Sequence, residues 1–216
     1  MIYPTVKFSP MKPLFLALLF TFTVPILATA QDETMKKDST EPVLPYRQIP
    51  DYPDAYSAGT VAARLIDGLG FRYYWATEGL REEDLQFQPN EEARTSRETL
   101  DHIYGLSLLI ARAPRGEANL QPSTEEELSF EELRRKTLEN FREAGELLRA
   151  SRDEEIARYN IIFQRGEEVA EFPFWNLING PIADALWHVG QVVSFRRSSG
   201  NPLNPKVSVF SGRVRE

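Results

Sequence analysis

The chain of 216 residues has only two histidines, and one of them shares a helical face with an acidic residue. Asp184 precedes His188 by four positions in the stretch NGPIADALWHVGQ, and this spacing places both side chains on one side of an α-helix. The other histidine, His102, lies in a second apolar segment, TLDHIYGLSLLIARA. Two imidazoles and a carboxylate are residue types that bind divalent metal ions, so these three residues are the candidate metal ligands.

On facing helices, the three side chains would form a triad that leaves coordination positions open for water or substrate. An ion bound in this way lowers the pKa of a coordinated water or polarises a substrate oxygen. The ion could be Zn, Ni, Mn or Fe, because imidazole and carboxylate donors suit all four. The alternative is a site without metal, in which His102 and Asp184 pair in the core because a buried charge needs a partner.

Three further residues are candidates for the surroundings of this site. Gln191 follows His188 by three positions, so it could orient that ligand or bind a coordinated water. Tyr73 and Trp187 could wall an apolar pocket, although aromatic residues in a helical protein are more often plain core residues. No residue stands out as the catalytic acid or base; Glu98 is the best outside candidate, and it also fits a helix cap.

The ligands must be positioned by helices, which the apolar periodicity predicts in four segments. Two of them begin with a capping box, Thr95 with Glu98 and Ser129 with Glu132. Arg196, near the end of the last helix, is expected to interact with the carbonyls of that helix. The expected helices cover about 54–77, from 95 to the residue before Pro114, from 129 onward, and from either Phe174 or Pro181 to Ser199.

These elements predict an all-α fold, an antiparallel four-helix bundle with long connections. A small hairpin-like excursion is expected before the last helix, because two short apolar runs flank Arg165-Gly166. Bundles of this kind often build metal sites in their core from side chains on facing helices.

Residues 1–30 are typical of an export signal peptide. Lys7 and Lys12 precede an apolar run that ends in Ala-Thr-Ala, an A-x-A cleavage motif. A transmembrane anchor is the alternative, because a run of about 18 residues is near the lower limit for crossing a bilayer. Cleavage would leave no stable membrane anchor and a periplasmic or extracellular protein. The rest is predicted to comprise a flexible leader at 31–54, a bundle domain at 55–202 and a C-terminal arm at 203–216.

The composition limits the classes of function. The formal net charge is -7 and the isoelectric point is about 5.1, which argues against a nucleic-acid partner. Because the chain has no cysteine, disulfides and thiol chemistry by the protein itself are excluded. The stability must therefore come from packing and from any bound metal.

Two blocks of the sequence resemble the DinB-like (DinB/YfiT-like) family of metal-binding four-helix bundles, over about 56–202. The block LREEDLQFQPNEEARTSRETLDHIYGL is similar to the family's loop and second helix, where His102 matches a ligand histidine. The block NGPIADALWHVGQVVSFRRSSGNP is similar to its last metal helix, where His188 and the following Gly-Gln match. Many members have histidine at the position of Asp184; a carboxylate still coordinates, but it leaves the identity of the metal open.

The resemblance implies a metal site but no single reaction, since relatives include thiol-dependent transferases or isomerases, hydrolytic members and many without an assigned reaction. We therefore expect an exported, divalent-metal-dependent hydrolase or transferase that acts on a small-molecule substrate. Relatives often form dimers, so a homodimer is a further expectation. The alternative is a non-catalytic periplasmic binding or structural module, for which a closed coordination sphere would be typical.

Overall fold

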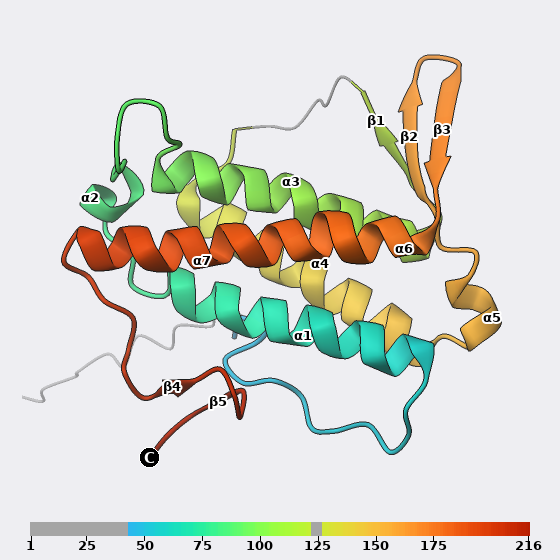
Figure 1. Ribbon diagram of the computed structural model, residues 1–216, viewed down its shortest axis with the longest axis horizontal. Helices are drawn as coiled ribbons and strands as arrows, with labels where there is room; N and C mark the ends of the chain where they lie inside the picture. Colours follow the sequence, from blue (N-terminus) through green and yellow to red (C-terminus); the bar gives the residue numbers. More distant parts are fainter. Residues whose placement is uncertain (1–42, 122–126) are drawn as a thin grey trace, which may run out of the picture. The chain divides into compact units, whose positions relative to one another are not determined.

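The computed structural model describes residues 43–121 and 127–216. The predicted signal peptide, residues 1–30, and the first part of the predicted leader lie outside the described residues. The described chain is mostly helical, as predicted, and carries a few short strands (Figure 1). In chain order its elements are α1 (Ala58–Thr77), α2 (Glu82–Leu85), α3 (Ser96–Arg115), β1 (Ala118–Leu120), α4 (Phe130–Ala150), α5 (Asp153–Ile156), β2 (Ile161–Arg165), β3 (Glu168–Phe172), α6 (Phe174–Leu177), η1 (Ile178–Ile182), α7 (Ala183–Ser198), β4 (Val207–Ser208) and β5 (Arg213–Val214).

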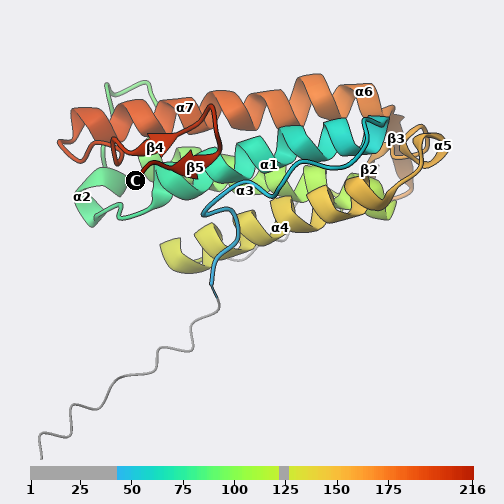
Figure 2. The same cartoon turned by 90° about the horizontal axis from the view of Figure 1, so that it is seen from below.

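The long helices α1, α3, α4 and α7 lie side by side. Helix α1 contacts both α4 and α7, and α3 contacts the same two helices. Figure 2 shows α7 and α4 on the outside, with α1 and α3 between them. Among the described residues, no helix is both long and apolar enough to span a lipid bilayer. The inward side chains form one apolar core, whose buried members include Ile66, Leu69, Leu100, Ile103, Phe141, Leu148 and Val189.

The predicted capping boxes are present at the starts of α3 and α4. The backbone N–H of Thr95 donates to the carboxylate of Glu98 at 2.8 Å, and the N–H of Glu98 donates to the hydroxyl of Thr95 at 3.1 Å. Ser129 and Glu132 form the same reciprocal pair at α4. Each box satisfies N–H groups that have no partner within the first helical turn.

Helix α3 was predicted to end before Pro114, but it ends at Arg115 and includes Pro114 in its last turn. A proline at this point removes only one hydrogen bond of the helix, and the following residues provide the termination. Gly116 adopts the left-handed conformation, with φ of 67°, and its N–H donates to the carbonyl of Ala113. The N–H of Glu117 donates to the carbonyl of Arg112, which completes a glycine-based helix end.

The predicted hairpin before the last helix is present as β2 and β3. These strands are antiparallel, with Ile161 opposite Phe172 and Arg165 opposite Glu168, and Gly166 occupies the turn with φ of 59°. The short strand β1 adds a parallel partner to β2 that the sequence did not predict. Three residues carry too little periodicity to identify a strand that exists only through its pairing.

The last helix begins at Phe174, the earlier of the two predicted starts, and continues through a π-helical segment, η1. Pro181 lies inside η1 and has no N–H to donate. The N–H of Ala183 donates to the carbonyl of Ile178, five residues earlier, so the turn is one residue wider than an α-helical turn. The wider turn lets the chain pass Pro181 without breaking the helix, and the α-helical pattern resumes just before Asp184.

Residues 43–54 depart from the prediction of a flexible leader, because part of this segment packs on the helices. Tyr46 is buried, and its ring lies against Gly70 of α1. Its φ of 69° lies in the left-handed region. Its hydroxyl donates to the buried carboxylate of Asp67 at 3.3 Å, and Arg149 of α4 donates to the same carboxylate at 2.7 Å. Burial raises the pKa of Asp67, while these donors oppose the rise.

The C-terminal arm forms a two-stranded turn, β4 with β5, and contacts the N-terminal segment. The N–H of Ile49 donates to the carbonyl of Gly212 at 2.9 Å, and Ile49 is buried against Phe71 and Trp75 of α1. The arm and the segment before α1 therefore stabilise each other on the same side of α1.

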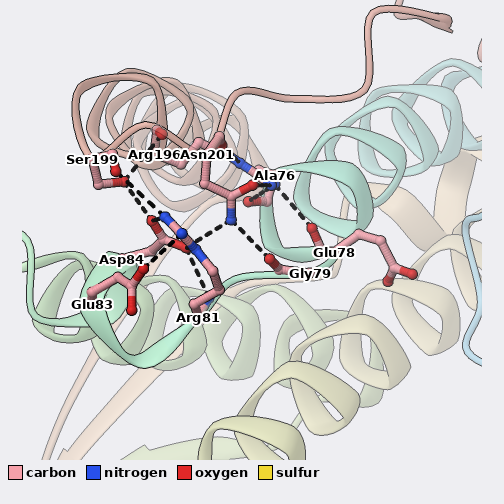
Figure 3. Close-up of polar contacts among 9 residues, drawn as sticks. All are labelled: Ala76, Glu78, Gly79, Arg81, Glu83, Asp84, Arg196, Ser199 and Asn201. Carbon is pink, nitrogen blue, oxygen red and sulfur yellow. Dashed lines mark hydrogen bonds and ion pairs between the residues drawn. The ribbon is translucent and has the colours of Figure 1, made fainter.

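Arg196 of α7 joins that helix to the end of α1. Its guanidinium is buried and donates hydrogen bonds to the backbone carbonyls of Trp75, Ala76 and Glu78 at 3.0–3.1 Å. Figure 3 shows the bonds to Ala76 and Glu78. These carbonyls lie at the C-terminal end of α1, where the helix dipole is negative and carbonyls lack donors. We predicted that Arg196 would interact with the carbonyls of its own helix. That prediction was wrong for these three bonds, because their acceptors lie at the end of α1.

A buried anion, Asp84 of α2, holds the neighbouring segments together (Figure 3). Its carboxylate accepts hydrogen bonds from Arg81 at 2.9 Å, from the amide of Asn201 at 2.7 Å and from the hydroxyl of Ser199. The Arg81 guanidinium beside it holds the pKa of Asp84 well below its usual range, with help from Ser199 and Asn201. The end of α7 is thereby fixed to α2 as well as to α1.

Replacing Gly70 with alanine is expected to destabilise the fold by about 1–3 kcal/mol, because the added methyl group would overlap the ring of Tyr46. Gly105 of α3 is the matched control, since a Cβ there meets no atom within 4 Å and alanine should stabilise the helix by up to about 1 kcal/mol. Urea unfolding followed by circular dichroism measures both variants. Similar effects at the two positions would contradict the packing of Tyr46 on Gly70.

Replacing Asp84 with asparagine is expected to cost about 1–3 kcal/mol at neutral pH, because buried donors lose a charged acceptor. The pKa of Asp84 is lower in the folded than in the unfolded protein, so its contribution is fully present above the unfolded pKa of about 4. It is lost as the pH falls through the folded pKa, and the difference between wild type and Asp84→Asn should shrink below about pH 4. Denaturant unfolding across pH measures it.

Glu83→Gln is the matched control for Asp84→Asn, because Glu83 also pairs with Arg81 but its side chain is 66% exposed. Its stability should stay close to that of the wild type at every pH. A pH-independent cost of Asp84→Asn would show that the carboxylate charge contributes nothing.

Candidate metal centre

The structure brings the three predicted ligands together where α3 passes the start of α7. Nε2 of His102 lies 3.1 Å from Oδ2 of Asp184, and Nε2 of His188 lies 3.3 Å from Oδ1 of the same carboxylate. The two imidazole rings stand edge to face, with their centroids 4.6 Å apart. One donor atom of each residue lies within 4.8 Å of the others, so the group could hold a metal ion.

Buried neighbours on each helix determine where the ligands point. In α3, Leu100 is fully buried, and His102 lies at the edge of that apolar face. In α7, Val189 is buried, and Asp184 and His188 lie together on the side of the helix that meets α3. Because η1 ends immediately before α7, the spacing from Asp184 to His188 is that of a regular α-helix.

Gln191 accepts a hydrogen bond from the ring of His188. Nδ1 of His188 lies 2.7 Å from Oε1 of Gln191, an atom that only accepts hydrogen bonds, so Nδ1 carries the proton. In the neutral imidazole, Nε2 then directs a lone pair at Asp184, where Oδ1 is 3.3 Å away. Two acceptors at this distance repel each other unless a proton or a cation lies between them. The outer contact to Gln191 is also the kind that metal-bound histidines commonly make.

The donor set and its spacing fit a first-row divalent ion. Imidazole nitrogen and carboxylate oxygen bind Zn²⁺ at about 2.0–2.2 Å, which places neighbouring donors about 3–3.5 Å apart. Each imidazole lies at such a distance from one oxygen of Asp184, at 3.1 and 3.3 Å, and one donor atom of each residue lies within 4.8 Å of the others. Zn, Ni, Mn and Fe all accept imidazole with carboxylate, so the donors are compatible with each of them.

One side of the cluster is open to solvent. The side chains of His102, Asp184 and His188 keep 33%, 41% and 15% of their accessible surface. A structural metal is usually enclosed by four protein ligands, whereas a catalytic metal keeps a position for water or substrate. Three donors with this exposure therefore favour a reactive site over a purely structural one.

A groove of about 690 Å³ extends from Asp184 to the hairpin. Its walls come from Leu106 and Leu109 of α3, from β2 and β3, and from the residues of η1 and early α7. Trp187, predicted as a pocket wall, lines this groove and is 72% exposed. The sequence did not reveal the groove, because the strand residues that close it meet α3 only in the folded chain.

Tyr73, the other predicted pocket wall, lies in the core instead. Its side chain is fully buried, and its ring stands edge-on to that of Phe141, with 6.0 Å between centroids. Among the described residues its hydroxyl has no hydrogen-bond partner, and burial raises the pKa of this group. Tyr73 does not line the groove beside Asp184, so it contributes to packing.

Glu98, the outside candidate for an acid or base, caps its own helix. Its carboxylate accepts hydrogen bonds from the backbone N–H and the hydroxyl of Thr95. These bonds, the backbone one first, hold the pKa of Glu98 below its usual range. A carboxylate that is ionised and engaged in this way is a helix cap, and we assign it no part in the site.

Comparison with protein-family models, with curated proteins and with solved structures finds no match to this chain. The chemistry of the centre must therefore be inferred from its own donors and their surroundings.

Replacing either His102 or His188 with alanine is expected to abolish stoichiometric metal binding and to leave the helical circular dichroism unchanged, since both side chains lie at the edge of the core. Gln191→Ala should weaken metal binding about 10- to 100-fold, because it removes the partner that orients His188. Elemental mass spectrometry and competition with a metallochromic chelator measure these effects.

Glu98→Gln is the control, because Glu98 precedes His102 by one turn but belongs to the helix cap. It should bind metal as the wild type does. A wild-type protein that binds none of Zn, Ni, Mn and Fe would rule out the metal centre.

Proposed function

We propose that the protein is a divalent-metal-dependent hydrolase or transferase with its metal at His102, Asp184 and His188. The observation that carries this proposal is the convergence of two imidazole Nε2 atoms on the two oxygens of one half-exposed carboxylate. The metal would supply a Lewis acid that activates water or polarises a substrate oxygen.

The protein's own residues would hold and orient the reacting groups. Asp184 offers one oxygen to the side of each histidine, and Gln191 fixes the ring of His188 through Nδ1. Because the three ligand side chains are exposed on one side, substrate can approach from solvent. The groove that begins at Asp184 is the place for the part of the substrate that does not react.

The proposal also includes membership of the DinB-like family and export from the cytoplasm, both of which rest on sequence features. Four long helices side by side, with ligands from α3 and α7, are compatible with a DinB-like four-helix bundle. Export to the periplasm or beyond follows from the signal-like segment 1–30, and a small-molecule substrate follows from the size of the groove. A homodimer follows from the resemblance alone.

A second candidate function is supported by the same contacts. His102 and His188 would need only protons to form ion pairs with Asp184 at 3.1 and 3.3 Å, which gives a metal-free polar cluster in a binding or structural module. The exposure of the cluster distinguishes the two candidates. Ion pairs between such exposed charges contribute little to the free energy of unfolding, so stability alone does not account for the cluster. An open metal site, in contrast, requires the exposure.

The metal-loaded protein is expected to hydrolyse members of a panel of aryl esters and amides, or to transfer their acyl group to an added nucleophile. His188→Ala should lower kcat/KM at least about 100-fold, because the site loses a ligand. Gln191→Ala should lower it about 10- to 100-fold. Steady-state kinetics with each of the four metals measure these effects.

Chelation should abolish this activity and re-addition of one metal should restore it. Activity that persists after complete metal removal would contradict the proposal. Metal binding without turnover of any substrate in the panel would favour the non-catalytic alternative.

A further inference from the structure

We propose that the groove beside Asp184 binds the uncharged, apolar body of the substrate, an alkyl or aryl group attached to an ester or amide. This inference rests on the proposed function and specifies its substrate class. The groove's volume of about 690 Å³ is that of a site for a small organic molecule. Since Asp184 lines one end, a molecule in the groove would place its oxygen-bearing head at the metal ligands.

The walls of the groove are largely apolar. Leu106 and Leu109 form the side that belongs to α3, and Ile161 and Phe163 of β2 lie across from them. Phe163 and Phe172 stack edge to face, with centroids 6.0 Å apart, so the two strands present a joined aromatic surface. Such a surface gains free energy by covering alkyl or aryl groups, roughly in proportion to the apolar area buried.

The charges of the groove exclude a charged body. Within the described ranges, Asp184 is the only ionisable residue that lines it, and no lysine or arginine does. An anionic body would therefore lose its hydration without gaining a cationic side chain as a partner. A neutral body avoids this cost.

Two side-chain amides provide polar contacts where the groove meets the last helix. Asn176 and Asn179 line it, and the described structure gives neither side chain a hydrogen-bond partner. An amide group both donates and accepts, which suits a neutral ester or amide group of a ligand. Specific pockets combine mostly apolar walls with a few polar groups in this way.

Two large aromatic side chains at the rim remain exposed without a ligand. Trp187 is 72% exposed and Phe172 is 42% exposed, and both line the groove. Exposed aromatic residues gathered around a groove mark sites that another molecule covers. Since Asp184, one of the candidate metal ligands, lines the same groove, a substrate accounts for that exposure.

The test uses linear alkyl hydroxamates of increasing length, from acetohydroxamate to octanohydroxamate, and the zinc-loaded protein in calorimetric titrations. The hydroxamate head binds the metal and is constant, so acetohydroxamate tests the metal centre and the added chain tests the groove. We expect Kd to fall about two- to fourfold for each added methylene until the groove is filled. A hydroxamate whose chain ends in a carboxylate should bind no tighter than acetohydroxamate.

Trp187→Ala and Phe172→Ser should each remove most of the chain-length dependence and leave the Kd of acetohydroxamate within about twofold. Both side chains are exposed, so their loss should not unfold the protein. Trp175→Ala is the matched control, because Trp175 is 75% exposed but lines a different groove, between α1 and α6. It should retain the full dependence.

A Kd that does not depend on chain length, or that responds equally to Trp187→Ala and Trp175→Ala, would overturn the inference. A dimer that dissociates in Trp187→Ala, measured by sedimentation, would also overturn it, because the groove would then belong to a contact between two copies. If acetohydroxamate fails to bind, the proposed metal centre fails. In that case octanamide, which has no metal-binding head, tests the groove alone. It should bind the wild type more tightly than Trp187→Ala.

Discussion

The buried guanidinium of Arg196 is the interaction on which the arrangement of the site depends. It gives donors to three carbonyls at the end of α1, and burial lowers its pKa while the negative helix end and nearby Asp84 favour its charge. A cation this deep in a protein is costly unless each donor has an acceptor. The carbonyls at the end of α1 accept from Nη1, and Asn201, just after α7, accepts from Nε and Nη2. This set of acceptors forms only where the end of α7 lies beside the end of α1. Because α7 carries Asp184 and His188, the same contact helps to set where two of the three candidate metal ligands lie.

The candidate centre combines two opposing requirements. Its ligands must be fixed closely enough for a carboxylate to reach two imidazoles, and the cluster must stay open to another molecule. The core residues of α3 and α7 meet the first requirement, since they leave the ligands little freedom to turn. The second is met at the edge of the core, where the apolar packing ends and the groove begins. The fixed positions of the candidate ligands and the access to them therefore come from one boundary between packed and solvent-exposed surface.

Local patterns in the sequence were sufficient to predict the long helices, the hairpin and the residues of the candidate site. The boxes at Thr95 and Ser129 identify helix starts because they use contacts within four residues, and the spacing of Asp184 and His188 is fixed by helical geometry. Pairing with His102 required the guess that two apolar helices face each other, which the structure supports.

Features that depend on distant contacts were missed or misjudged. Tyr46 follows a polar, proline-rich segment, and nothing within that segment shows that Gly70 and Asp67 form its binding place. Arg196 looked like the cap of its own helix, because the acceptors it uses lie about 120 residues earlier. The walls of the groove were also missed, because they come from segments that are distant in the sequence. The sequence pattern shows the periodicity of a helix or strand, but it does not show which other elements that helix or strand contacts in the folded protein.

The π-helical segment lets the last helix hold one residue more than a plain α-helix would hold between two buried positions. Leu177 before it and Val189 after it are both buried in the core, although twelve α-helical steps of 100° would leave them about 120° apart. The extra residue in η1 absorbs most of that difference. If the same residues formed a plain α-helix, either the ligand half or the preceding half would turn by about 100°. Deleting one residue from η1 would instead leave eleven steps, about 20°, between Leu177 and Val189, so the π-helical segment is a spare residue whose loss would keep Asp184 directed at His102.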